Sequence, residues 1–174
     1  MTPFLRLTAL LALGLTAACA GNSRFDNADN EVILGANNGQ LPGIADGSAS
    51  DPTSPVYFSQ TIGDRVFFAV DQSTLSAEAQ AVLASQAQWL ITNFDYQAII
   101  EGHADEQGTT EYNIALSARR ANEVRQFLVA RGVPAARLRT LPLGKERPAE
   151  LCSSESCYSK NRRAVTVISI GALS

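Results

Sequence analysis

Apolar positions recur with the spacing of regular secondary structure only in the last two thirds of the chain. Residues 65–70 and 98–100 are short apolar runs rich in β-formers, and each predicts a buried strand. Residues 138–143 and 164–170 predict two further strands by the same pattern.

Helical spacing fills two of the intervals between these strands. Ser76 is suited to cap a helix that continues to about Leu90, and a second helix is predicted from about Thr110 to Arg131. Gly132, just past the second helix, is a typical stop signal. Alternating strands and helices predict a layered α/β domain with helices packed against one sheet.

The first eighteen residues follow the pattern of a secretory signal peptide. Arg6 is their only charge, and an apolar run at residues 5–15 is followed by small residues. Thr16-Ala17-Ala18-Cys19 resembles the bacterial lipobox, although Leu15 lies one position earlier than that pattern prefers. We therefore expect lipidation of Cys19 and anchoring in the outer membrane. The alternative is an ordinary signal peptide that happens to contain a cysteine.

Residues 19–60 predict a flexible linker, and residues 61–174 predict the folded domain. The linker is rich in Asn, Gly, Ser, Asp and Pro and has no sustained apolar period. About forty such residues would span on the order of 35 Å root-mean-square. A linker of this kind would let the domain act at a distance from its anchor.

Charge and cysteine content exclude several kinds of partner. The chain has a net charge of −3 and no basic stripe, which argues against nucleic acid as a partner. His103 is the only histidine, so neither a metal site nor a cofactor is expected. Cys152 and Cys157 flank a polar segment, predicted to be a loop, and we expect a disulfide in an oxidising periplasm. Two free thiols are the alternative.

The segment from Glu101 to Gly108, together with the helix that follows, carries the candidate chemistry. Asp105 could accept hydrogen bonds from an ammonium group, and Arg120 could bind a carboxylate with two parallel hydrogen bonds. The loop that begins at Ala104 precedes a helix, where free backbone amides can bind an anion. Spacing alone leaves another interpretation open, in which Asp105 caps the turn and Arg120 pairs with it or with a neighbouring acid.

Five motifs extend this segment and resemble the outer-membrane protein A-like peptidoglycan-binding domain over about residues 64–170. In order, they are Gly102-His-Ala-Asp105-x-x-Gly108, Tyr112-Asn113, Leu116-Ser117-x-x-Arg120-Ala121, Gly144-x-x-x-Pro148 and Asn161-Arg162-Arg163. With the lipobox and the linker, the chain is similar to the lipoproteins of that family that act in the Tol–Pal system. The resemblance implies a βαβαββ α+β sandwich, with helices packed on a mixed four-stranded sheet.

The resemblance also implies a ligand, the diaminopimelate of the peptidoglycan stem peptide. Asp105 and Arg120 match the residues of the family that bind its ammonium and carboxylate. The remaining residues implied as ligand contacts are Asp71, Ala104, Asn113 and Leu116, and those implied as supporting are His103, Gly108 and Arg163.

The resemblance further implies a role in linking the outer membrane to the cell wall, in envelope integrity and in outer-membrane constriction during cell division. A periplasmic β-propeller protein of the Tol system is the implied protein partner, on a surface that overlaps the peptidoglycan site. An alternative is a hydrolase that uses Glu101, Asp105 or Glu106 as acid and base. Because the sequence offers no paired nucleophile and base, we expect a binding protein and not an enzyme. Another alternative is the same domain acting only as a stator or a porin-associated protein.

Overall fold

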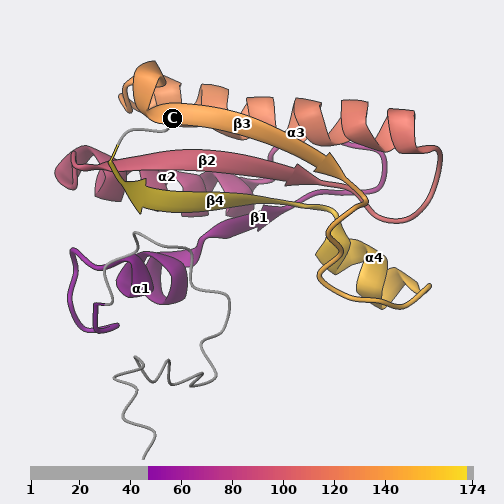
Figure 1. Cartoon of the computed structure of the whole chain (residues 1–174), viewed down its shortest axis with the longest axis horizontal. Coiled ribbons are helices and arrows are strands. Elements are labelled where there is room, and N and C mark those ends of the chain that lie inside the picture. Colours follow the sequence, from indigo (N-terminus) through magenta and orange to yellow (C-terminus); the bar gives the residue numbers. More distant parts are fainter. Residues whose placement is uncertain (1–46, 172–174) are drawn as a thin grey trace, which may run out of the picture. The chain divides into compact units, whose positions relative to one another are not determined.

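A four-stranded sheet with the strand order β1-β4-β2-β3 forms the centre of the computed structural model, which describes residues 47–171 (Figure 1). The strands are β1 (Arg65–Phe67), β2 (Tyr96–His103), β3 (Leu138–Gly144) and β4 (Arg163–Ile170). Strand β4 pairs antiparallel with β1 and β2, whereas β2 and β3 are parallel. The predicted mixed sheet and the α/β class are therefore confirmed.

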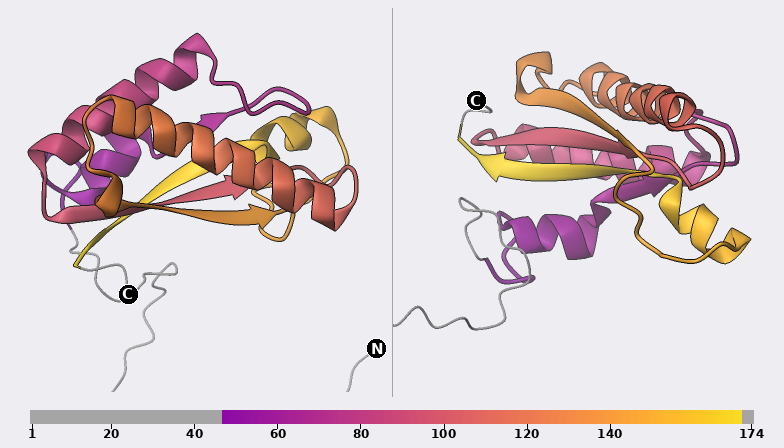
Figure 2. Two further views of the ribbon diagram at one scale, coloured as in Figure 1. Left: turned by 90° about the horizontal axis from the view of Figure 1, so that it is seen from above. Right: turned by 45° about the vertical axis from the view of Figure 1, so that its right-hand side comes forward.

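Two long helices, α2 (Ala77–Thr92) and α3 (Thr110–Ala130), lie over the same face of this sheet (Figure 2). Ser76 and Thr109 cap them, since each hydroxyl accepts a hydrogen bond at 3.2 Å from the amide three residues later. Gly132 follows α3 with a φ of +101°, as expected of a helix stop. Both helices begin and end within two residues of the predicted positions.

The buried core lies between the helices and the inner face of the sheet. It contains Leu83 and Leu90 from α2, and Val124 and Leu128 from α3. Strands β2 and β4 contribute the remaining central side chains, which are Ala98, Ile100, Ala164 and Ile168.

Gly102 allows α3 to approach β2 unusually closely. A Cβ atom at this position would lie 2.0 Å from the backbone oxygen of Ser117, which is closer than any real contact. The Ser117 hydroxyl in turn accepts a hydrogen bond at 3.0 Å from the amide of Gly144, at the end of β3. These contacts hold the first half of α3 against the carboxyl ends of the two parallel strands.

Residues 52–60, which the sequence assigns to the linker, pack against the folded domain. They include α1 (Pro55–Tyr57) and the start of a π-helix (Phe58–Gly63). Phe58 is only 1% exposed, and its ring lies 4.9 Å from that of Trp89. The indole of Trp89 also donates a hydrogen bond to the carbonyl of Pro52 at 2.7 Å. The folded structure therefore begins before residue 61, where the sequence placed the boundary.

Two further expectations differ from the structure. Strand β1 ends at Phe67 instead of residue 70, because the carbonyls of Phe68 and Ala69 accept hydrogen bonds from arginine side chains. The segment between the two cysteines is not simply a loop, since it enters helix α4 (Glu155–Asn161). A short 3₁₀ helix, Ala135–Arg137, precedes β3.

The lipobox and Cys19 lie outside the described residues. Within residues 47–171, no helix combines the length and the apolar character needed to cross a membrane.

Candidate ligand-binding site

A pocket of about 290 Å³ lies where β2 ends and α3 begins. Its walls come from the loop after β1, from the loop between β2 and α3, and from one face of α3. The lining residues are Val70, Asp71, Asp105, Gln107, Gly108, Tyr112, Asn113, Leu116 and Arg120. Five of the six residues predicted as ligand contacts are thus brought together.

Arg120 is fully buried at this pocket, while its neighbour Arg119 is exposed. Its guanidinium donates hydrogen bonds to the carbonyls of Gln72 (2.8 Å), His103 (2.8 Å) and Ala69 (3.3 Å). The guanidinium carbon also lies 5.2 Å from the centre of the Phe68 ring. Arg120 therefore joins the loop after β1 to the end of β2.

The charge of Arg120 has no carboxylate at ion-pair distance among residues 47–171. Burial lowers the pKa of Arg120 to about 10, so the side chain remains cationic at neutral pH. Three of its five N–H groups are used by the carbonyls, which leaves one on each terminal nitrogen. A buried cation with two free donors is suited to bind an anion.

Asp105 is 8% exposed and takes Arg162 as its cationic partner. One terminal nitrogen of Arg162 lies 3.2 Å from Oδ2 of Asp105, and the amide of Gln107 donates to Oδ1 at 3.2 Å. The interpretation in which Asp105 and Arg120 form a pair is therefore wrong, whereas a turn hydrogen bond to Asp105 is present.

Asn113 holds the loop that carries Asp105. Its amide nitrogen donates to the carbonyls of Asp105 at 3.3 Å and of Gln107 at 2.8 Å. Because the amide nitrogen of Asn113 donates both of its hydrogen bonds to these carbonyls, the main effect of Asn113 on the pocket is to fix the shape of the loop. Gly108, in the same loop, adopts a φ of +87°, which favours glycine.

Asp71 lines the same pocket and belongs to the segment after β1. It is the one residue other than glycine with a positive φ (+57°) within the described part of the chain. The hydroxyl of Tyr112 donates a hydrogen bond to its carboxylate. Asp71 is exposed, so its carboxylate is accessible to a ligand from solvent.

Three predicted residues do not line the pocket. Ala104 is buried, and its amide donates to the carbonyl of Gly144 at 2.7 Å, so it is not free to bind a carboxylate. His103 contributes its backbone carbonyl to Arg120, while its buried ring lies 3.6 Å from Glu101. Arg163 donates to the carbonyls of Arg147 and Asn161 and supports the fold away from the pocket.

The sequence patterns missed four residues of the site: three that line the pocket and one that pairs with Asp105. Val70, Gln107 and Tyr112 line the pocket, and Arg162 binds Asp105. The Tyr112-Asn113 and Asn161-Arg162-Arg163 motifs contained two of them. No local signal distinguished Arg162 from Arg163 as the residue that faces the acid.

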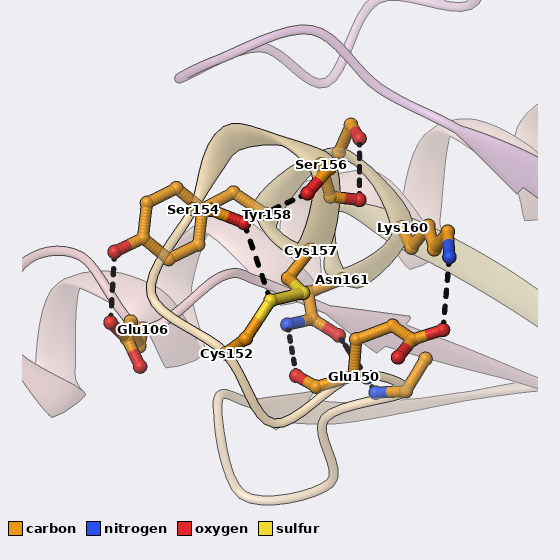
Figure 3. The surroundings of a disulfide bond; sticks show 11 residues. Glu106, Glu150, Cys152, Ser154, Ser156, Cys157, Tyr158, Lys160 and Asn161 are labelled. Atoms are coloured by element: carbon orange, nitrogen blue, oxygen red, sulfur yellow. Dashed lines mark hydrogen bonds and ion pairs between the residues drawn. A yellow bond between two sulfur atoms is a disulfide. The ribbon is translucent and has the colours of Figure 1, made fainter.

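A disulfide between Cys152 and Cys157 closes a six-residue ring at the start of α4, with Cα atoms 5.8 Å apart (Figure 3). Tyr158 in α4 donates a hydrogen bond at 2.8 Å to Glu106, in the loop between β2 and α3. This bond fastens α4 to the loop that contains Asp105.

Comparison with known proteins agrees with this architecture. The model of the OmpA family matches residues 67–162. The chain is 47% identical over 163 residues to the peptidoglycan-associated lipoprotein of Mesorhizobium japonicum, covering 94% of this chain and 90% of that protein. It is 46% identical over 169 residues to the protein of the same name from Rhizobium meliloti, covering 97% and 91%.

The chain belongs to the peptidoglycan-associated lipoprotein family, within the OmpA family. Its fold also matches the crystal structure of the peptidoglycan-associated lipoprotein from Burkholderia pseudomallei, at 37% identity and a TM-score of 0.61. That match covers 69% of this chain and 98% of the other. The predicted family is confirmed, and its members are binding proteins, not enzymes.

Proposed function

We propose that this protein is an outer-membrane lipoprotein that binds peptidoglycan noncovalently, through the diaminopimelate of the stem peptide, and tethers the outer membrane to the cell wall as part of the Tol–Pal system. The relatives described above are named for their association with peptidoglycan. The anchor is the acylated Cys19, and the folded domain lies in the periplasm. The protein supports envelope integrity and outer-membrane constriction during cell division.

The buried charge of Arg120, which has no ion-pair partner among residues 47–171, is the observation that carries this proposal. Arg120, which keeps one N–H group on each terminal nitrogen beyond its three carbonyl bonds, lines a pocket that Asp71 and Asp105 also line. The free end of diaminopimelate carries a carboxylate and an ammonium on one carbon. The carboxylate of such a zwitterion would pair with Arg120, and its ammonium would pair with Asp71 and Asp105.

The ligand carboxylate accepts hydrogen bonds from Arg120, and its ammonium donates to Asp105 and Asp71. Val70 and Leu116 line the same pocket and contact the methylene chain that leads to the rest of the stem peptide. No bond is formed or broken, so affinity rests on charged hydrogen bonds and shape.

A change in the ligand tests this proposal without disturbing the fold. Calorimetry of the full-length protein in detergent would compare three stem peptides. The first contains diaminopimelate, and the second contains lysine, which lacks the side-chain carboxylate. The third contains diaminopimelate that is acetylated on its free amine. Because a hydrogen bond to a charged group contributes about 1.5–3 kcal/mol, we expect each altered peptide to bind at least about tenfold more weakly. Equal affinity for all three peptides would exclude a zwitterion pocket.

Asp105→Asn provides the matching change in the protein, since it keeps the shape of the side chain and removes its charge. We expect this variant to be retained less on purified sacculi than the unaltered protein. Normal retention of a folded Asp105→Asn variant would remove Asp105 from the site.

The Tol β-propeller protein is the proposed second partner, on a surface that overlaps the pocket. Soluble propeller should then release the protein from sacculi, because the two partners compete for one surface. Simultaneous binding of both partners would contradict the shared surface. Mass spectrometry of the mature N-terminus tests the anchor, and an unmodified Cys19 would refute it.

A further inference from the structure

Arg162 lies between two carboxylates that belong to different parts of the fold. One of its terminal nitrogens is 3.2 Å from Asp105, and the other donates a hydrogen bond to Glu155 in the first turn of α4. Its Nε donates to the carbonyl of Phe68 at 3.2 Å. Arg162 is buried, so these partners fix both its position and the direction of its charge.

The charges around the pocket leave Asp105 dependent on Glu155. Asp105 is flanked by two cations, because Arg120 lines the same pocket and Arg162 is its direct partner. Glu155 supplies a second anion to Arg162 and thereby offsets part of that positive charge. Without Glu155, the guanidinium of Arg162 would have Asp105 as its single carboxylate partner. Asp105 would then attract an ammonium group less strongly.

Glu155 is held in place by covalent structure, although its side chain is 67% exposed. It lies inside the six-residue ring that the Cys152–Cys157 disulfide closes. Helix α4, which begins inside the ring, is fastened to the pocket loop by the hydrogen bond from Tyr158 to Glu106. Holding a glutamate against an arginine costs backbone and side-chain entropy, and the disulfide ring reduces the backbone part of that cost.

We propose that Glu155, held by the Cys152–Cys157 disulfide, is a positioning residue for the ligand pocket: it orients Arg162 and offsets its charge, so that Asp105 remains available to the ammonium group of the ligand. This inference rests on the proposed function, since it concerns the affinity of the same pocket for a zwitterion. Glu155 does not line the pocket itself. Its effect on the ligand is transmitted through Arg162 and Asp105.

Glu155→Gln tests the inference, because it keeps the size of the side chain and removes its charge. We expect the stem peptide with diaminopimelate to bind about threefold to tenfold more weakly to this variant, measured by calorimetry on the full-length protein. Glu155→Asp keeps the charge and should recover part of the affinity.

Glu150→Gln is the matched control. Glu150 forms an ion pair at 3.0 Å with Lys160, in the last turn of α4, and no hydrogen bond or ion pair joins it to Arg162 in the described part of the chain. Its loss removes one exposed salt bridge of the same segment and should leave the affinity unchanged. If Glu150→Gln weakens binding as much as Glu155→Gln, the effect is a general loosening of α4 and the inference is overturned.

A double-mutant cycle separates positioning from stability. Glu155→Gln should have no further effect on affinity when combined with Asp105→Asn, because its influence passes through that carboxylate. The Cys152→Ser/Cys157→Ser double variant should weaken binding in the same direction as Glu155→Gln. Additive losses from Glu155 and Asp105 would overturn the inference.

The outcomes distinguish the two proposals. If the unaltered protein does not bind the diaminopimelate peptide, the proposed function fails and this inference fails with it. If the unaltered protein binds and Glu155→Gln binds equally well, the positioning role alone is refuted.

Discussion

Asp105 forms its ion pair with Arg162, which lies 57 residues later in the chain, and not with Arg120, which lies beside it at the same pocket. The two arginines consequently have different structural roles. Arg162 fixes the acid, while Arg120 keeps two N–H groups free and joins three backbone carbonyls. An acid and a cation held apart at one pocket provide separate sites for the two charges of a zwitterion.

Arg120→Ala should destabilise the domain as well as abolish ligand binding. Its removal leaves the carbonyls of Ala69, Gln72 and His103 without their donor, and we expect a loss of about 3 kcal/mol or more in the free energy of unfolding. Urea denaturation measures this loss, and Arg119→Ala at an exposed position is the matched control. An Arg120→Ala variant as stable as Arg119→Ala would contradict the bridging role of the guanidinium.

Phe58→Ala should show that the segment before residue 61 belongs to the folded domain. Removal of this buried ring from its contact with Trp89 should cost about 3–5 kcal/mol. Phe94 is 73% exposed, so Phe94→Ala should change the stability by less than about 0.5 kcal/mol. Similar thermal midpoints for the two variants would show that residues 52–60 act as a linker after all.

Gly102→Ala should force α3 away from β2. The added Cβ would lie 2.0 Å from the backbone oxygen of Ser117, and overpacking against the backbone should cost about 3 kcal/mol or more. Gly171→Ala provides a comparison, since nothing among residues 47–171 lies within 4 Å of its added Cβ and its φ of +100° is what opposes the change. That strain is worth about 1–2 kcal/mol. Because Ser117 is next to Leu116, we also expect weaker ligand binding by Gly102→Ala, and unchanged stability would contradict the close approach.

The Cys152→Ser/Cys157→Ser double variant should unfold at a lower denaturant concentration. Closing a loop of six residues constrains the unfolded chain by about 2 kcal/mol in the loop-entropy estimate. Ser156→Ala is the control, because Ser156 is an exposed residue inside the ring and its substitution leaves the disulfide intact. A double variant as stable as this control would show that the ring does not contribute to folding.

Acid should weaken the fold through carboxylates that are paired in the native state. The guanidinium of Arg162 lowers the pKa of Glu155, and the side chain of His103 lowers that of Glu101. A lowered pKa in the folded state means that the stabilisation is fully present above the unfolded value, about 4.3, and is lost as the pH falls through the native value. Stability should therefore decline below about pH 4.3, as measured by denaturation at successive pH values. Glu155→Gln should reduce this decline, and an unchanged pH profile in the variant would count against its pairing with Arg162.

Local patterns in the sequence were sufficient to predict the four strands and the two long helices of the fold. Strand runs and helical spacing located four strands and two long helices, and the residues that cap those helices were correct for Ser76 and Gly132. These features depend on interactions within a few residues, so a single sequence contains them. Helix α4 was not predicted, because it is short and mostly polar and therefore has no apolar period.

The candidate site could be predicted as a set of residues but not as a set of contacts. The motifs contained Asp105, Asn113, Leu116 and Arg120, the family resemblance added Asp71, and the structure places all five around one pocket. The motifs could not show that the amide of Ala104 donates a hydrogen bond to the carbonyl of Gly144. They also could not show that Asp105 pairs with Arg162, or that Phe58 is buried against Trp89. Each of these contacts joins residues that are between about 30 and 60 positions apart. Such pairings depend on how loops and helix ends pack in three dimensions, and the period or capping of any one segment carries no information about them.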